Sequence, residues 1–71
     1  MSFQPPPETI GERVRRQRKR LKLEVRDLAA KADVSPATVA RIEAGAFPRE
    51  ETLARIAKAL GAPVDWLRGG N

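Results

Sequence analysis

Apolar residues recur every three or four positions through most of this sequence. Residues with that spacing share one face of an α-helix, whereas a half-buried strand alternates with a period of two. No stretch alternates in that way over a useful length, and five segments with the helical spacing are separated by short turns. The pattern therefore predicts an all-α fold, a compact bundle of five helices.

Local start and stop signals agree with this pattern. Thr9 and Glu12 form a capping-box sequence, which places the start of the first helix after Thr9, with Ile10, Val14 and Leu21 on its inward stripe. Later helices are predicted at about residues 25–32, 36–44, 50–60 and 64–68. The other residues expected in the core are Leu28, Ala29, Ala32, Val39, Ile42, Leu53, Ile56, Ala57 and Leu60, with Val64, Trp66 or Leu67 from the last helix.

The third helix has the clearest boundaries. Ser35 is a favoured N-cap, and Pro36 supplies a preset φ at the first helical position. Gly45 is the expected left-handed residue after its end. Glu24 is a weaker cap for the second helix, so that boundary is predicted less sharply.

The two ends of the chain lack helical spacing. Residues 1–8, MSFQPPPE, are interpreted as a flexible proline-rich arm, and residues 69–71 as a short tail. Residues 9–68 then form one domain, because 71 residues are too few for a second core or for a catalytic cleft between two lobes.

Composition excludes several function classes. The sequence has no Cys and no His, which removes disulfides, zinc fingers, thiol nucleophiles and the commonest general base. We expect no enzyme activity, metal, cofactor or small-molecule ligand. There is no export signal or apolar stretch long enough to span a bilayer, so a cytoplasmic, nucleoid-associated protein is expected.

A net charge of +5 on 71 residues favours a polyanionic partner. Nucleic acid ranks before an acidic membrane, because the basic first helix lacks the bulky aromatic face of membrane-surface helices. Two short helices at 25–32 and 36–44, joined by a tight turn through Asp33 and Val34, also fit a helix-turn-helix unit.

Specific stretches strengthen that interpretation. From Ile10 to Asn71 the chain resembles the Cro/C1-type helix-turn-helix family, which includes the lambdoid phage repressors, in DLAAKADVSPATVARIEAG and ETLARIAKALGAPVDWL. The resemblance implies a lambda-repressor-like fold. It also implies a transcriptional regulator that prefers particular sequences of double-stranded DNA and sets its third helix in the major groove.

A helical wheel of the third helix separates its two faces. Val39, Ile42 and Glu43 share the inward side, and the outward side carries small residues around Arg41, the leading base reader. The candidate base contacts are Pro36, Ala37, Thr38, Ala40 and Arg41. Phage repressors often carry glutamine at the positions of Val25 and Pro36, so direct base reading should be sparse here and DNA shape should contribute. The alternative for Arg41 is a solvated surface side chain.

Phosphate contacts are expected around this helix. Arg20, Lys22 and Arg26 are candidates because they lie close to the start of the second helix. The resemblance implies further contacts through backbone N–H groups at Val25, Ala46 and Phe47, with Arg49 beside them. The remaining cations of the first helix are interpreted as a solvated face.

Arg18 and Glu43 are predicted to form a structural ion pair. Arg18 follows Val14 by four residues and Glu43 follows Val39 by four, so both charges face the core. An unpaired charge there would cost several kcal/mol, and members of the family have such a pair at the matching positions.

Two further expectations concern partners. Trp66 is expected to close the core, and an exposed Leu67 with Val64 could form a self-complementary patch for a two-fold homodimer. The alternative function is an antitoxin-like or adaptor module, in which the alanine-rich face of the third helix binds a protein partner instead of DNA.

Overall fold

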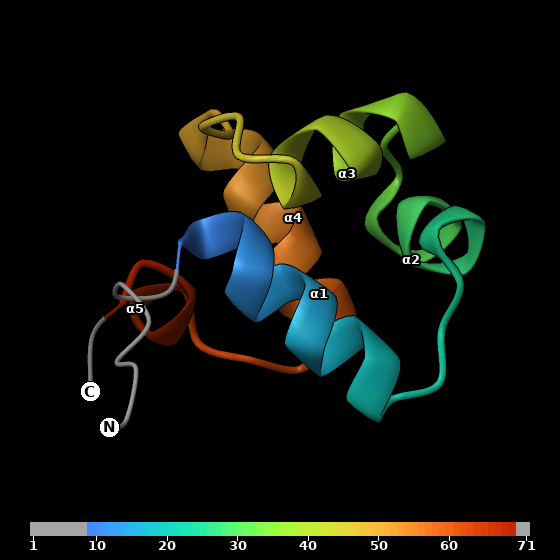
Figure 1. Ribbon diagram of the computed structural model, residues 1–71, viewed down its shortest axis with the longest axis horizontal. Coiled ribbons are helices and arrows are strands. Elements are labelled where there is room, and N and C mark those ends of the chain that lie inside the picture. Colours follow the sequence, from blue (N-terminus) through green and yellow to red (C-terminus); the bar gives the residue numbers. More distant parts are fainter. Residues whose placement is uncertain (1–8, 70–71) are drawn as a thin grey trace, which may run out of the picture.

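The computed structural model describes residues 9–69, and in this range every regular element is a helix (Figure 1). The predicted all-α, five-helix fold is confirmed. The predicted arm at residues 1–8 lies outside the described residues, as do Gly70 and Asn71 of the predicted tail. The helices are α1 (Ile10–Arg20), α2 (Val25–Ala32), α3 (Pro36–Glu43), α4 (Glu50–Leu60) and α5 (Val64–Leu67).

The predicted capping groups form the expected hydrogen bonds. The backbone N–H of Glu12 donates to Thr9 Oγ1 at 3.1 Å, and the Thr9 N–H donates to Glu12 Oε1 at 2.8 Å. At the start of α3, the Thr38 N–H donates to Ser35 Oγ at 3.1 Å. These bonds satisfy N–H groups that have no partner inside the helix, and they fix where each helix begins.

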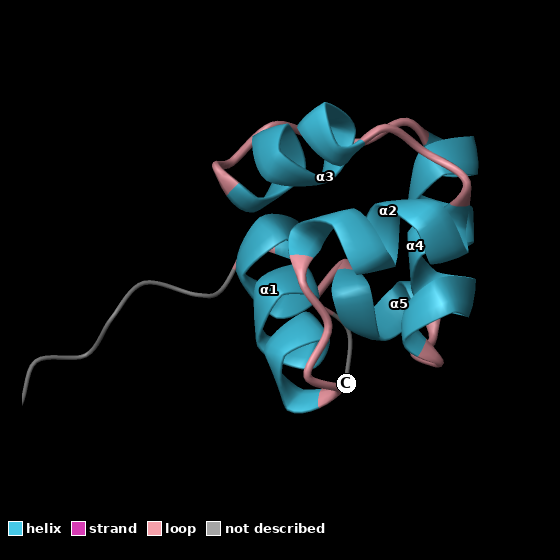
Figure 2. Cartoon of the chain, turned by 90° about the vertical axis from the view of Figure 1, so that its right-hand side faces the viewer, coloured by secondary structure: helices cyan, strands magenta, loops and turns pink. Residues whose placement is uncertain are grey.

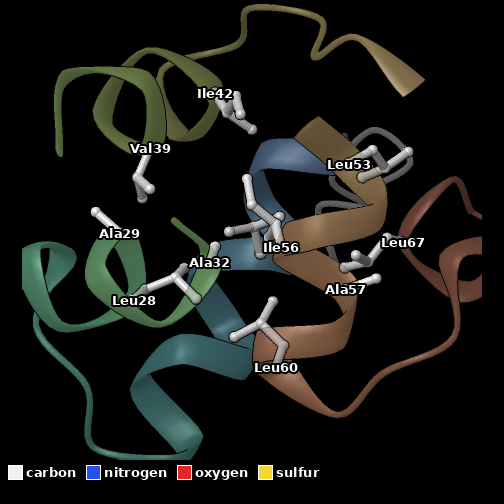
Figure 3. Close-up of a cluster of buried hydrophobic side chains, with 11 residues drawn as sticks. Leu28, Ala29, Ala32, Val39, Ile42, Leu53, Ile56, Ala57, Leu60 and Leu67 are labelled. Atoms are coloured by element: carbon white, nitrogen blue, oxygen red, sulfur yellow. The ribbon is translucent and has the colours of Figure 1, made fainter. Parts of the chain in front are cut away.

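The core lies where the five helices meet (Figure 3). α2 packs against α3 and α4, and α1 packs against α3, α4 and α5. Ile56 of α4, Val14 of α1 and Val39 of α3 are fully buried. Every residue that the sequence places in the core from α2, α3 and α4 is buried there. The positions of these helices are therefore set by one shared apolar cluster.

Two predictions about apolar side chains are wrong. Leu21 is 44% exposed, because α1 ends at Arg20 and Leu21 is the residue that follows its last turn. Leu67 is completely buried, while Val64 and Trp66 are half-buried against the core. A surface patch that relies on an exposed Leu67 is therefore not present. The homodimer itself stays a prediction.

Gly11 allows α1 and α3 to approach closely. A Cβ atom at this position would lie 1.9 Å from the carbonyl oxygen of Ile42, well inside van der Waals contact. Only glycine fits there without movement of the helices. α3 itself lies along an outer edge of the molecule in both views (Figures 1 and 2).

No helix within residues 9–69 combines the length and the apolar character that crossing a membrane requires.

Candidate nucleic-acid interface

α2 and α3 are joined by a turn of three residues, Asp33 to Ser35. The N–H of Asp33 donates to the carbonyl oxygen of Ala30 at 3.2 Å, and the N–H of Val34 donates to that of Ala29 at 3.0 Å. Asp33 has a φ of 59°, in the left-handed region that aspartate tolerates better than most residues. The turn therefore satisfies the end of α2 while redirecting the chain into α3.

Arg55 of α4 holds this turn in place. Its Nη1 donates to the Asp33 carbonyl oxygen at 3.2 Å, and its Nη2 donates to Glu51 Oε2 at 2.9 Å. The Asp33 carboxylate oxygen Oδ2 lies 3.9 Å from the same guanidinium. Nothing in the sequence around Arg55 indicates a partner 22 residues away, so this contact was not predicted.

α3 has the two faces that its sequence predicts. Val39 and Ile42 are buried, and the side chain of Glu43 is nearly so. Thr38 lies on the flank, half-buried, with Oγ1 at 2.8 Å from Ser35 Oγ. The exposed residues of α3 and its C-cap are Pro36, Ala37, Ala40, Arg41 and Ala44.

Arg41 is the long side chain on this exposed face. Its guanidinium forms no hydrogen bond or ion pair with any residue of the described range 9–69. It borders a depression of about 350 Å³ between the end of α3 and the start of α4, together with Thr38, Arg49 and Thr52. Two arginines and two threonines therefore border one depression beside the exposed face of α3.

The predicted ion pair between Arg18 and Glu43 is confirmed. Arg18 Nε donates to Glu43 Oε2 at 2.7 Å and Nη2 donates to Oε1 at 2.9 Å, a bidentate geometry. Both side chains are only 10% exposed. The hydrogen bond that Arg18 donates to Glu43 is the main cause that raises the pKa of Arg18, partly opposed by burial. The pair therefore locks the end of α3 against α1.

Arg18 makes a third contact that the sequence analysis missed. Its Nη1 donates to the carbonyl oxygen of Leu23 at 2.9 Å. Leu23 lies in the turn between α1 and α2, so one guanidinium joins that turn to the C-terminal end of α3. This guanidinium therefore fixes the distance between the start of α2 and the end of α3.

The structure separates the three backbone N–H groups expected at phosphate. Those of Val25 and Phe47 have no acceptor within residues 9–69. The N–H of Ala46, by contrast, donates to the carbonyl oxygen of Arg41 at 2.9 Å. This bond belongs to the left-handed turn at Gly45, which closes the end of α3. The expectation that Ala46 offers a free donor is therefore wrong.

The four cationic side chains that are candidates for phosphate binding lie in different parts of the chain. Lys22, Arg26 and Arg49 are exposed: Lys22 lies in the turn between α1 and α2, Arg26 in the first turn of α2, and Arg49 at the N-cap of α4. Arg20 is exposed as well, in the last turn of α1.

Arg13, earlier in α1, contacts α5. Arg13 Nη1 donates to the carbonyl oxygen of Trp66 in α5 at 2.9 Å, and the guanidinium lies 5.2 Å from the Trp66 ring centroid. Phosphate binding by Arg20 stays a prediction.

Comparisons with known proteins agree with this geometry. A family model described as helix-turn-helix matches residues 14–67. The chain is similar to the P22 c2 repressor protein in its crystal structure with synthetic operator 9T, with 32% identity and a TM-score of 0.83 over 90% of this chain and 98% of that one. It is also similar to the solution structure of the DNA-binding domain of the P22 c2 repressor, with 31% identity and a TM-score of 0.81 over 89% of this chain and 84% of that one. The chain belongs to the Cro/C1-type helix-turn-helix family.

Proposed function

We propose that this protein binds double-stranded DNA with a preference for particular sequences and acts as a transcriptional regulator. The observation that carries the proposal is the exposed face of α3, on which alanines surround the Arg41 guanidinium, a group without a partner among residues 9–69. The similarity of the whole chain to the P22 c2 repressor in complex with an operator supports DNA as the ligand.

In this proposal α3 lies in the major groove. Small side chains at Ala37, Ala40 and Ala44 let the helix backbone approach the base edges, and an alanine methyl can contact a thymine methyl. Arg41 donates two hydrogen bonds to guanine O6 and N7, the commonest specific contact of its kind. Pro36 and Thr38 border the same bases at the start of the helix. With one long polar reader, part of the sequence preference comes from DNA shape.

Phosphate contacts then set the orientation of α3. In this proposal the phosphates are bound by the N–H groups of Val25 and Phe47, which have no acceptor within residues 9–69, and by the exposed side chains of Lys22, Arg26 and Arg49. Phosphate contacts orient the protein without reading sequence. Because Arg18 ties the turn before α2 to the end of α3, the distance between these two groups of contacts is fixed before DNA binds.

Selection of bound sequences from a random duplex pool, at a stated salt concentration, tests the proposal. We expect an enriched motif, and an inverted repeat would also indicate a dimer on DNA. The logarithm of the affinity should fall linearly with the logarithm of the salt concentration, by about 0.9 for each phosphate contacted. A protein with no affinity for duplex DNA at low salt would overturn the proposal.

The alanine-rich face of α3 also suits packing against a partner protein, as in an antitoxin-like or adaptor module. A pull-down from the native host at high salt discriminates the two, because salt suppresses binding bridged by DNA. A stoichiometric protein partner, together with no enrichment in the duplex selection, would favour the adaptor function over DNA binding.

A further inference from the structure

Phe47 is an exposed aromatic residue in the loop between α3 and α4. Its exposed fraction is 89%, and among residues 9–69 the other large hydrophobic side chain with substantial exposure is Leu21, at 44%. Single exposed apolar side chains are common on protein surfaces and need no special explanation. The surroundings of Phe47 are what indicate a ligand.

Phe47 borders the depression that lies beside the exposed face of α3. Arg41 and Arg49 line the same depression, and Thr38 and Thr52 add hydroxyl groups. One apolar ring is therefore placed next to two cations and two hydrogen-bonding side chains. A ligand that fits this surface must combine negative charge with apolar area.

The loop constrains the backbone that carries the ring. At its start, the N–H of Gly45 donates to the carbonyl oxygen of Ile42 at 3.0 Å, and the N–H of Ala46 donates to that of Arg41 at 2.9 Å. Pro48 restricts the residue before it, Phe47, to extended backbone. The Phe47 N–H has no acceptor within residues 9–69, so the ring and a free donor are presented together.

We propose that the Phe47 side chain packs against a deoxyribose of the DNA strand that borders the groove entered by α3. A nucleic-acid strand alternates an anionic phosphate with an apolar sugar face. Arg49 and the Phe47 N–H bind the flanking phosphates, and the ring covers the sugar between them. This inference rests on the proposed function, and it assigns to the Phe47 side chain a role separate from that of its backbone.

The sugar contact predicts a specific pattern of binding defects. Phe47→Ala should weaken binding to the selected duplex and to a random duplex equally, by about tenfold, since a partly buried phenyl ring contributes about that much. Phe47→Leu keeps part of the apolar contact and should lose about threefold. Neither variant should change the salt dependence, because no charge is removed.

Arg49→Gln is the matched comparison, from the same depression. It should also weaken binding to both duplexes, but it should reduce the slope of log affinity against log salt by about 1. Thermal denaturation of each variant should match that of the unaltered protein, because Phe47 and Arg49 are exposed.

The outcomes are distinguishable. Unchanged affinity of Phe47→Ala for both duplexes would overturn the sugar contact. A loss confined to the selected duplex would also overturn it, because the ring would then be reading or unstacking bases. If the unaltered protein bound neither duplex, the proposed function itself would fail, whatever the variants did.

Discussion

The guanidinium of Arg18 meets the carboxylate of Glu43 through two parallel hydrogen bonds, which join the last turn of α1 to the last residue of α3. The same guanidinium donates to the carbonyl oxygen of Leu23, in the turn that leads into α2. One side chain therefore ties together the three segments around the proposed DNA-binding surface. Because the pair is buried, it is sensitive to the loss of either partner.

Removal of Arg18 should destabilise the fold strongly. Arg18→Met leaves the Glu43 carboxylate buried and without its cation, and such changes cost about 3–5 kcal/mol. Urea denaturation followed by circular dichroism measures the free energy of unfolding. The double variant Arg18→Met, Glu43→Leu should recover most of the loss, because no uncompensated charge remains. A double variant as unstable as the single one would contradict this account of the pair.

Lys22 occupies a backbone conformation that favours glycine. Its φ is 60°, in the left-handed region, where a residue with a Cβ atom is strained and glycine is not. Lys22→Gly should raise the free energy of unfolding by about 0.5–1 kcal/mol through relief of this strain. The same change should weaken DNA binding and lower the salt slope by about 0.9, because one phosphate contact is lost.

Lys22→Ala is the control for this trade between stability and binding. It removes the same charge but keeps a Cβ atom in the left-handed region, so it should lose DNA affinity without gaining stability. Chemical denaturation and a salt titration of duplex binding measure the two effects separately. Equal stability of the glycine and alanine variants would show that the backbone at Lys22 is not strained.

Local signals account for what the sequence predicts well. The caps at Thr9 and Ser35 and the left-handed Gly45 act within three or four residues, so they can be identified without the tertiary structure. The hydrogen bond of the Ala46 N–H could also have been anticipated. In a helix that ends with a left-handed glycine, the N–H of the residue after the glycine normally donates to a carbonyl of the last turn.

Tertiary relationships account for what it does not predict. Leu67 faces the core because of how α5 lies on α1 and α4, which its own four-residue helix does not encode. Leu21 continues the periodic stripe of the first helix, yet the helix ends before it. The contact between Arg55 and Asp33 and the closeness of Gly11 to Ile42 likewise join residues far apart in the chain.

Gly11 provides a test of the close approach between α1 and α3. Gly11→Ala should lower the free energy of unfolding by about 1–3 kcal/mol, because the new Cβ would clash with backbone atoms of Ile42. Alanine otherwise favours helix over glycine by about 1 kcal/mol, so a net loss identifies the clash. Thermal and urea denaturation measure the change. An alanine variant more stable than the unaltered protein would show that α1 can move away freely.

Arg41 provides the test of base reading. Its guanidinium is exposed on α3 and has no partner within residues 9–69, so its removal leaves the fold intact. Arg41→Ala should narrow the gap between the selected duplex and a random duplex by about 1–3 kcal/mol, the contribution of one bidentate contact to guanine. Equilibrium binding to both duplexes, at the salt concentration used for selection, measures the gap.

Lys22→Ala serves as the comparison for this variant, because a phosphate contact contributes equally on every sequence. It should weaken binding to the selected and random duplexes alike and leave the gap between them unchanged. A further duplex has the guanine assigned to Arg41 replaced. On this duplex the unaltered protein and Arg41→Ala should differ in affinity only by the non-specific contribution of the lost charge. If Arg41→Ala kept the full sequence preference, reading would have to come from the small residues of α3 and from DNA shape alone.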